Sequence, residues 1–332
     1  MKLALGVAAA RGAAARFRRG ALAVFRHELR LIAHAPMTPL LIAGLLTALT
    51  AGVFVIGEFY SSDQASADLL WTFLPWAAVV FVPALAMRAY SEENGDRSLN
   101  LVMALPIADG AVVAGKWAAG VVILLVALGG TLPFVATIAY LGDPDWGALT
   151  GGFIGAALLL ATSLALAHAA AAWTRDAAGG YLAGVVLLLA LLLTGTDGVQ
   201  RFLAGTPLSG TATWIASAGP KPWLDRMSTG RIEAGALSSF VALTGVALTL
   251  AWLALSGRRR QGAITRVRVR PIVVAAAGLA AVYASSVIGT RLPLIADLSA
   301  GRAFTLHAET VAAARGAASG TRIDLYWSAD EA

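Results

Sequence analysis

Cysteine is missing from this sequence of 332 residues. Its absence excludes disulfide bonds, cysteine nucleophiles and metal sites built from thiolates. Charged residues are also scarce, at 13% of the chain, whereas typical soluble proteins contain ~25%. Hydrophobic residues make up 58%. So few charges cannot cover the water-exposed surface of a soluble protein of this length, so the composition indicates an integral membrane protein.

Lysine is rare, and the basic residues are mostly arginines. Lys and Arg together number 25 against 19 acidic residues, which gives a net charge of +6. In a membrane protein, a basic excess is typical of cytoplasmic loops that face anionic lipid headgroups. We therefore expect the lipid bilayer, and no nucleic acid, as a partner of the chain.

Reactive side chains form no cluster in the sequence. The four histidines are scattered, so we expect no metal site. Ser163 and His168 are close in sequence but do not share a helix face, and an intramembrane hydrolase needs a nucleophile aligned with its base. We therefore expect no catalytic residue, which argues against an intramembrane enzyme. A His168 that packs inside the protein or faces the lipid headgroups near the end of a span is the simpler interpretation.

Seven stretches are apolar and long enough to cross a bilayer as helices. They cover residues 39–57, 69–90, 111–141, 148–173, 178–195, 236–257 and 271–290. The fold class is therefore all-α integral membrane, with a six-span domain at 39–257 and a seventh, anchoring span at 271–290. Pro75, Pro83 and Pro133 lie inside the second and third spans, where proline kinks a helix.

The segment before the first span, 1–38, predicts a cytoplasmic tail with an amphipathic helix over 11–35. Apolar side chains recur on one face of this helix: Leu22, Phe25, Leu29 and Ile32. Arginines occupy another face: Arg18, Arg26 and Arg30. Such a helix lies in the headgroup plane and extends its arginines toward water.

The distribution of Lys and Arg sets the expected orientation. Basic residues are concentrated before the first span and in the linker 258–270, which are therefore cytoplasmic. The loops after the first and third spans carry aspartates and no basic residue, so we expect them outside. The N-terminus is then cytoplasmic and the C-terminus extracytoplasmic. The loop 196–235 carries charges of both signs and is ambiguous.

Residues Gly110–Trp117 match most of a phosphate-binding P-loop, but Trp117 stands where the motif requires Ser or Thr for Mg²⁺. No strand precedes the match, and an apolar span follows it. We therefore interpret Lys116 as a residue at the cytoplasmic end of the third span that extends toward lipid phosphates.

The loop 91–110 combines a capping serine with acidic residues and then an apolar stretch that ends at Pro106. Ser91, Glu92 and Glu93 suit the first turn of a helix. The pattern predicts a short cytoplasmic helix. A solvated connector and a helix that docks into a soluble partner fit this pattern equally well.

Residues 291–332 no longer have the composition of a membrane span. His307–Gly316 predicts a short helix, and the alternation over Arg322–Ser328 predicts a strand. One helix and one strand cannot form a core. We therefore expect this segment to be the truncated start of a larger extracytoplasmic α/β domain.

Several motifs, in order, resemble the ABC-2 class of ATP-binding-cassette permeases along roughly residues 20–260, and in particular the gliding-motility-type branch. They are Phe25-Arg26-His27-Glu28-Leu29, Leu74-Pro75-Trp76, Pro83-Ala84-Leu85-Ala86-Met87-Arg88, Glu92-Glu93, Leu105-Pro106, Gly115-Lys116, Leu132-Pro133 and Tyr140-Leu141-Gly142-Asp143-Pro144-Asp145-Trp146. Residues 271–332 look like the start of the family's auxiliary subunit, on the motifs Arg302-Ala303-Phe304-Thr305-Leu306 and Ile323-Asp324-Leu325-Tyr326-Trp327-Ser328. The chain thus looks like a permease fused to an auxiliary subunit.

The resemblance implies the membrane subunit of an exporter in the cell (inner) membrane. Such permeases form a homodimer or a paired permease and bind separate ATPase subunits, which carry ATP and Mg²⁺, so this chain needs no cofactor. By this resemblance, Glu92, Glu93, Arg97 and Leu99 would couple the chain to the ATPase. Arg26, Glu28, Arg88 and Lys116 would lie at the cytoplasmic interface.

Two other functions stay open. The seventh span also suits a membrane anchor that holds an extracytoplasmic domain and transports nothing. A secondary transporter is a further alternative, but such proteins usually carry charged residues near the bilayer midplane, and few are present here.

Overall fold

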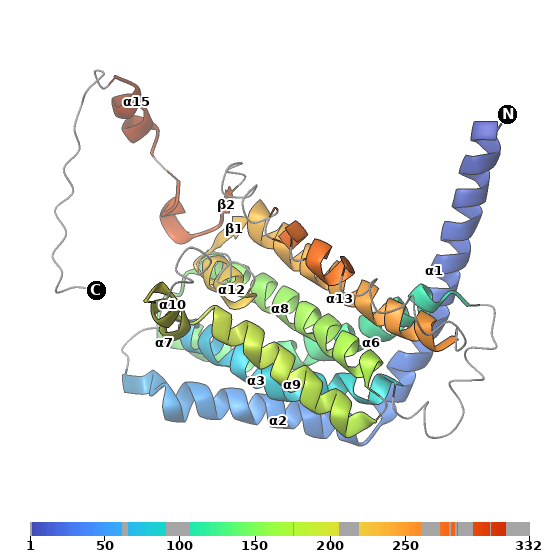
Figure 1. Cartoon of the computed structure of the whole chain (residues 1–332). Helices are drawn as coiled ribbons and strands as arrows, with labels where there is room; N and C mark the ends of the chain where they lie inside the picture. Colours follow the sequence, from blue (N-terminus) through green and yellow to red (C-terminus); the bar gives the residue numbers. More distant parts are fainter. Residues whose placement is uncertain are drawn as a thin grey trace.

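The computed structural model describes residues 2–61, 66–90, 107–174, 176–205, 219–259, 273–278, 280–282, 284, 295–305 and 307–316. Helices that run side by side dominate this part of the chain (Figure 1). In chain order, the elements that form the main bundle are α1 (Lys2–His34), α2 (Met37–Ala51) with the π-helical turn Gly52–Ile56, α3 (Asp68–Ala86), α6 (Asp109–Gly129), α7 (Leu132–Leu141), α8 (Trp146–Trp173), α9 (Ala177–Thr194) and α13 (Ala234–Arg259). The shorter elements are the 3₁₀ turns Phe59–Ser61 and Ala300–Arg302, α10 (Asp197–Ala204), α12 (Lys221–Ser228), β1 (Arg231–Glu233), β2 (Ile295–Asp297) and α15 (Ala308–Gly316).

The six spans predicted for the region 39–257 are confirmed as helices. Within the described residues, six helical stretches are long and apolar enough to cross a membrane: Met37–Ser61, Asp68–Tyr90, Asp109–Leu141, Trp146–Trp173, Ala177–Thr194 and Ala234–Gly257. The predicted seventh span is described only in part, as the shorter apolar helix Val273–Val282.

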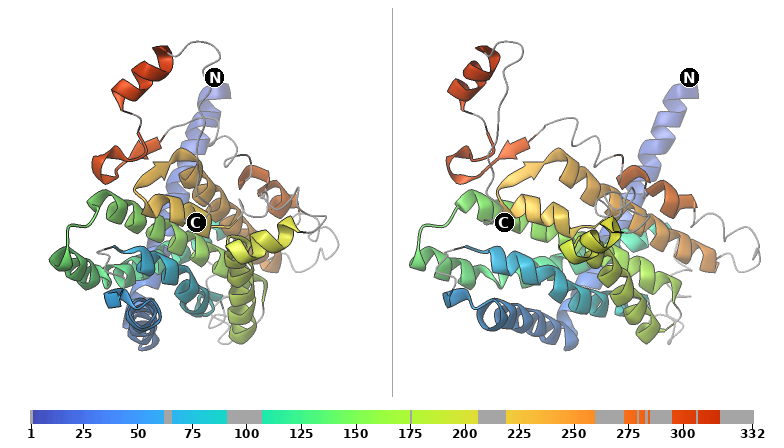
Figure 2. Two further views of the ribbon diagram at one scale, coloured as in Figure 1. Left: turned by 90° about the vertical axis from the view of Figure 1, so that its left-hand side faces the viewer. Right: turned by 60° about the vertical axis from the view of Figure 1, so that its left-hand side comes forward.

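Helix α8 lies at the centre of the bundle, where α3, α6, α9, α12 and α13 all pack against it (Figure 2). Of the most apolar 18-residue stretch of α8, 67% is buried inside the protein, against 22% for the span that contains α2. A helix surrounded by other helices needs small side chains so that its neighbours can approach closely. The alanines and glycines of α8 meet this requirement.

Two glycines near the start of α8 are required by this packing. A Cβ on Gly151 would lie 2.2 Å from the carbonyl oxygen of Met227 in α12. A Cβ on Gly152 would lie 2.4 Å from the indole ring of Trp71 in α3. Because real side chains do not reach such distances, any larger residue would force α12 or α3 away from α8.

The bundle has two distinct ends, which we name for the elements that lie there. At the α1 end, α1 crosses the bundle, α2 and α6 begin, and α3 and α8 end (Figure 1). At the β1–β2 end, α8 and α13 begin and α10, α12 and the two strands lie. Consecutive spans therefore alternate in direction, as successive membrane crossings must.

The prolines of the spans have different surroundings. Pro75 and Pro83 lie within α3, which is one continuous α-helix. In the third span α6 ends at Gly129, and Pro133 lies in the first turn of the separate helix α7. Proline suits the first turn because N–H groups there have no partner within the helix, so the lack of an N–H costs no hydrogen bond.

Helix α1 starts earlier than the predicted 11–35 and ends at His34, before Pro36. Its contact face also differs from the predicted apolar face. Leu22 is 46% exposed, whereas Val24 packs against the core together with Leu29 and Ile32. Val24 makes this contact because α6 approaches α1 closely at Gly115. A Cβ on Gly115 would clash with the side chain of Val24.

The segments on either side of α13 contain elements that the sequence pattern did not predict. Strand β2 pairs antiparallel with β1, so that Ile232 lies opposite Ala296. The loop predicted over 196–235 therefore contains β1 as well as the helices α10 and α12. The helix predicted at His307–Gly316 is confirmed as α15, whereas the predicted strand 322–328 lies outside the described residues.

The packing at Gly151 predicts that an added methyl group lowers stability there but not at a glycine with open space around it. Gly151→Ala should lower the stability of the purified protein by about 1–3 kcal/mol, because the new methyl group overlaps a backbone oxygen. Gly245→Ala is the matched control, since nothing lies within 4 Å of its Cβ position, and it should raise stability by about 0.5–1 kcal/mol through helix propensity. Thermal unfolding in detergent measures both, and equal effects would contradict this packing.

Candidate functional site

The α1 end of the bundle contains a close helix–helix contact with charged residues in it. Helix α1 runs beside the first turns of α6, with Phe17 next to Gly110 and Val24 next to Gly115. A Cβ on Gly115 would lie 2.8 Å from the carbonyl oxygen of Ala21. The two backbones therefore approach closely, and glycine at this position makes the approach possible.

One turn further along α1, Glu28 forms a buried ion pair with Lys116 of α6. The Nζ atom of Lys116 donates to Oε2 of Glu28 across 3.0 Å. Glu28 is 8% exposed and Lys116 4%. Removing one partner of a buried pair leaves a buried charge without compensation, which costs about 3–5 kcal/mol. The pair therefore holds α1 in one register along α6.

The interpretation of Lys116 as a residue that extends toward lipid phosphates is wrong. Lys116 points into the protein, because Glu28 compensates its charge there and the side chain is almost fully buried. The P-loop-like stretch Gly110–Trp117 is helical over its whole length within α6, so it forms no phosphate-binding loop.

A cavity of about 300 Å³ lies beside this ion pair. Its ionisable lining comes from four side chains on four helices or helix ends, Glu28, Arg88, Lys116 and His168, and Thr38 also lines it. The remaining walls are mostly apolar, with Leu31, Met37, Leu41 and Leu85 among them. The cavity therefore combines charged side chains on one side with apolar walls, next to the connection between α1 and α2.

His168 contributes the most deeply buried polar group of this cavity. It is 2% exposed, and its ring packs edge-on against Tyr90 with the centroids 5.5 Å apart. Its Nδ1 atom is buried without a hydrogen-bond partner among the described residues. The sequence left a packed and a headgroup-facing histidine open, and the structure shows the packed one. The neighbouring Arg88 and Lys116 could not be foreseen from the local pattern.

Three of the four residues predicted at the cytoplasmic interface lie together in the structure. Glu28, Arg88 and Lys116 share the cavity, whereas Arg26 is exposed on α1 and does not line it. The predicted coupling residues Glu92, Glu93, Arg97 and Leu99 lie outside the described residues. The burial of Glu28 had a partial signal in the sequence, because it stands four residues before Ile32 on the apolar face of α1, but its partner had none.

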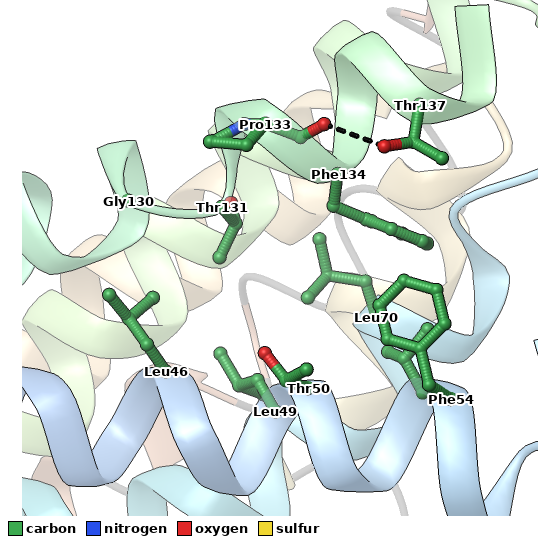
Figure 3. Close-up of a pocket in the computed structure, with 11 residues that line it drawn as sticks. Leu46, Leu49, Thr50, Phe54, Leu70, Gly130, Thr131, Pro133, Phe134 and Thr137 are labelled. Carbon is green, nitrogen blue, oxygen red and sulfur yellow. Dashed lines mark hydrogen bonds between the residues drawn. The ribbon is translucent and has the colours of Figure 1, made fainter. Parts of the chain in front are cut away.

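A second cavity, of about 240 Å³, lies at the break between α6 and α7 (Figure 3). Leu49 and Thr50 of α2 face Thr131 and Phe134 across it. Phe134 also contacts Phe54 edge to face, with the ring centroids 5.6 Å apart. This cavity lacks charged side chains, so it is a packing gap beside the helix break and offers no chemistry for a charged ligand.

At the β1–β2 end, Asp145 connects two parts of the chain. Its Oδ1 accepts from the N–H groups of Gly147 and Ala148 and thereby caps α8, at 2.8 and 3.0 Å. Its Oδ2 accepts from the N–H of Ala300, 2.8 Å away. Burial raises the pKa of the Asp145 carboxyl, but these three N–H groups outweigh burial and hold the pKa below its ordinary value.

Asp297 organises the segment that Asp145 holds. Its carboxylate accepts from the hydroxyl and N–H of Ser299, the N–H of Phe304 and the hydroxyl of Thr305. The Ser299 hydroxyl is the main reason why the pKa of Asp297 lies below its ordinary value, and the other donors add to it. The β1–β2 end is therefore a fixed contact between residues 295–305 and the spans.

Other polar groups inside the bundle pair with each other. The hydroxyls of Thr162 in α8 and Thr244 in α13 lie 2.9 Å apart, and Nε1 of Trp117 donates to the carbonyl of Ala161. Such bonds satisfy polar groups that lipid cannot. Among the residues that the structure describes, no group of three or more His, Asp or Glu could hold a metal ion.

This arrangement of six apolar spans, one of which (α8) is largely buried by its neighbours, defines a multi-pass α-helical membrane protein. The sequence profile of the ABC-2 family transporter proteins matches residues 40–256, which is more than half of the chain. The chain belongs to this family and is the membrane (permease) subunit of an ABC-2 transporter. A search of curated proteins finds no significant match.

Family membership fixes what the chain does in general terms. It is a transport subunit without an ATPase domain, and no cofactor is expected in it. ABC permeases pair with ATPase subunits, which supply the energy for transport. Residues 40–256 correspond closely to the six-span domain predicted at 39–257.

The buried ion pair predicts non-additive stability effects. Lys116→Met should lower the free energy of unfolding by about 3–5 kcal/mol, because Glu28 loses its partner. Adding Glu28→Gln should recover most of the loss, since no buried charge is then left. Lys221→Met is the matched control: it breaks the pair with Asp225, whose side chain is 45% exposed, and should cost less than about 1 kcal/mol. Equal losses for the two lysine variants would contradict a structural role of the Glu28–Lys116 pair.

The Asp145 contacts predict an acid-dependent contribution to stability. Asp145→Ala should cost about 0.5–2 kcal/mol as a lost helix cap. Because the folded-state pKa is lowered, the stabilisation is full above the unfolded pKa of about 3.9 and is lost as the pH falls through the folded pKa. The difference in melting temperature between wild type and variant should therefore be constant from pH 8 to 5 and shrink below pH 4.

The neighbouring Asp143 provides the control for this measurement. It is exposed and lies in the same loop as Asp145, so Asp143→Ala removes the same charge without removing a cap. A pH-independent difference for Asp145→Ala, or an equal effect of Asp143→Ala, would show that the cap does not stabilise the protein.

Proposed function

We propose that this permease exports its substrate and that the ATPase binds at the α1 end of the bundle. The observation that carries this proposal is the Glu28–Lys116 pair, which fastens α1 to the start of the third span. A force on α1 from outside the bundle would therefore reach α6 directly. The amphipathic character of α1, with its exposed Arg26, suits a helix at the membrane surface.

The expected coupling residues lie between two described positions at the same end of the molecule. Tyr90, at the end of the second span, and Ile107, before α6, both lie at the α1 end, and the segment with Glu92, Glu93, Arg97 and Leu99 connects them. This connection supports assigning these four residues to contact with the ATPase. ATP-driven closure of the ATPase subunits would then favour one arrangement of the spans over another.

The cytoplasm is assigned to the α1 end. The basic residues of α1 belong to this end, and α13, which the basic linker 258–270 follows in the sequence, ends there, which supports a cytoplasmic assignment. The aspartates of the loop before α8 lie at the opposite end. The N-terminus is then cytoplasmic, and β1 and β2 are extracytoplasmic.

Three described positions support a seventh crossing after α13. Helix α13 ends at Arg259, at the α1 end. Gly278 then packs against Val246, near the middle of α13, and Ala296 pairs with Ile232 just before α13 begins. The chain therefore runs back along α13, which supports a span near 271–290 and an extracytoplasmic continuation.

This return supports the further assignment to the gliding-motility-type branch, with a permease fused to the start of its auxiliary subunit. In such an assembly the chain would form a homodimer or a paired permease with two ATPase subunits. The direct contact of residues 295–305 with the external loops is what a fused auxiliary segment needs in order to follow movements of the spans.

The same contact favours the second candidate function, a non-transporting membrane anchor. Asp145 fixes Ala300 to the start of α8, and an anchor would use the bundle mainly to hold an extracytoplasmic domain in place. The two functions differ in whether an ATPase is bound and whether substrate crosses the bilayer.

Co-purification tests the proposed function. A pull-down in mild detergent should recover an ATPase subunit with the wild-type chain, and Glu92→Ala/Glu93→Ala should reduce its recovery about tenfold through loss of charged contacts. Asp143→Ala, at the opposite end, should leave recovery unchanged. Unchanged recovery with the double variant would overturn the coupling assignment, and absence of any ATPase from the wild-type preparation would favour the anchor.

A further inference from the structure

Residues 295–305, which we call the strap, contact two elements of the β1–β2 end at once. The N–H of Leu298 donates to the carbonyl oxygen of Gly230, in the turn between α12 and β1, across 3.0 Å. Two residues later, the N–H of Ala300 donates to Oδ2 of Asp145, which caps α8, across 2.8 Å. The strap therefore connects the start of α8 to the end of α12.

Glycine allows the strap to lie close to both elements. A Cβ on Gly147, in the first turn of α8, would lie 1.6 Å from the carbonyl oxygen of Leu298. Gly230 has a φ of +85°, which side chains disfavour, and a Cβ there would lie 3.0 Å from the backbone nitrogen of Ser299. At both points the backbone of the strap therefore lies directly against the backbone of its partner.

The strap is also held together by its own hydrogen bonds. The carboxylate of Asp297 accepts from the hydroxyls of Ser299 and Thr305 and from the N–H of Phe304. The guanidinium of Arg231 in β1 lies over the Phe304 ring, 5.9 Å from its centroid. A segment with these internal bonds resists stretching, so α8 and α12 cannot separate at this end unless the strap leaves one of them.

The two elements that the strap connects also form walls of a further cavity, of about 260 Å³. Asp145 and Ala148 line this cavity at the start of α8, and Thr229 lines it at the end of α12. Ser66 and Asp68, at the start of α3, line it from another side. Asp145 thus belongs to both structures, because it accepts a hydrogen bond from the strap and also lines the cavity.

We propose that the strap is a latch, which keeps the start of α8 and the end of α12 together and thereby holds the cavity between them and α3 closed. Release of the strap from Asp145 and Gly230 would let the end of α12 move away from α8 and open the cavity to solvent. One turn further along α8, Gly151 lies against the backbone of Met227 in α12. Opening would therefore be a rotation of α12 about that contact.

The latch gives the segment after α13 a role in the movement of the spans as well as a place of attachment. A change in the extracytoplasmic segment that pulls the strap away would alter the end of α8, which is the central helix of the bundle. The inference goes beyond the proposed function, because it concerns contacts within one chain. It depends neither on a bound ATPase nor on which substrate the permease carries.

Labelling of a single cysteine tests the latch in the full chain, purified in detergent. Ala67→Cys is the reporter, because Ala67 lines the cavity and is 5% exposed, and the chain has no other cysteine. Ala300→Pro removes the N–H that Asp145 accepts from, and should raise the rate of labelling by a water-soluble maleimide about tenfold, as expected for one lost charge-assisted hydrogen bond. Proline suits this position, because Ala300 is the first residue of a 3₁₀ turn and Ser299 before it has a ψ of 150°.

Ala300→Ser is the matched control, since it changes the same exposed side chain and keeps the N–H. It should change the labelling rate less than twofold. Gly147→Ala is a second test variant, which carries the test if Ala300→Pro does not fold. Its methyl group would displace the carbonyl of Leu298 and should therefore also raise the labelling rate. Equal rates for Ala300→Pro and Ala300→Ser would overturn the proposal.

A disulfide between the strands measures separately whether the strap is docked. Ile232 lies opposite Ala296, and opposite residues of antiparallel strands have Cα atoms about 4.5–5.5 Å apart, which a disulfide can span. Without the reporter cysteine, Ile232→Cys/Ala296→Cys should form a cross-link readily under mild oxidation, and adding Ala300→Pro should slow its formation. Slower cross-linking together with unchanged labelling of Ala67→Cys would show that the strap leaves without opening the cavity, and would overturn the latch.

Discussion

The contact of Glu28 with Lys116 is the constraint on which the α1 end of this permease depends. A lysine inside an apolar helix is tolerated only where an opposite charge compensates it. Since that charge comes from α1, the two helices cannot slide or separate without leaving a charge buried in the membrane. Gly115, one residue before Lys116, lets the backbones approach closely enough for the pair to form. The register of α1 then fixes where the chain turns at Pro36 and begins α2.

The two ends of the bundle are thereby specialised in different ways. At the α1 end, charged groups meet inside the protein and surround a cavity, so this end can respond to a partner or a ligand. At the β1–β2 end, Asp145 and Asp297 bind backbone N–H groups in a fixed pattern, so this end can hold a following segment in place. The central α8 connects them, since Asp145 caps its start and His168 lies near its end. A movement of α8 would therefore displace residues at both the α1 end and the β1–β2 end of the bundle.

The spans were predictable because each is an uninterrupted apolar stretch, and the bilayer imposes a minimum length on such helices. Helix α15 could be predicted from local periodicity. The partner of Lys116 could not be predicted, because Glu28 stands 88 positions away in the sequence and nothing in the pattern near Lys116 indicates it. Strand β1 has three residues, too few for alternation to be visible, and it exists because β2 pairs with it. Leu22 has the right spacing for the buried face of α1 but is exposed, since the close approach at Gly115 decides which side of the helix packs.

The central claim is that the α1 end faces the cytoplasm and that residues 295–305 lie on the other side of the membrane. Because the chain has no cysteine, single cysteines can be labelled without background. Ala14 and Ala300 are both exposed, so Ala14→Cys and Ala300→Cys report on the two ends. With a membrane-impermeable maleimide on intact cells, Ala300→Cys should be labelled at once and Ala14→Cys only after the membrane is opened. Labelling of both from the same side would contradict the account.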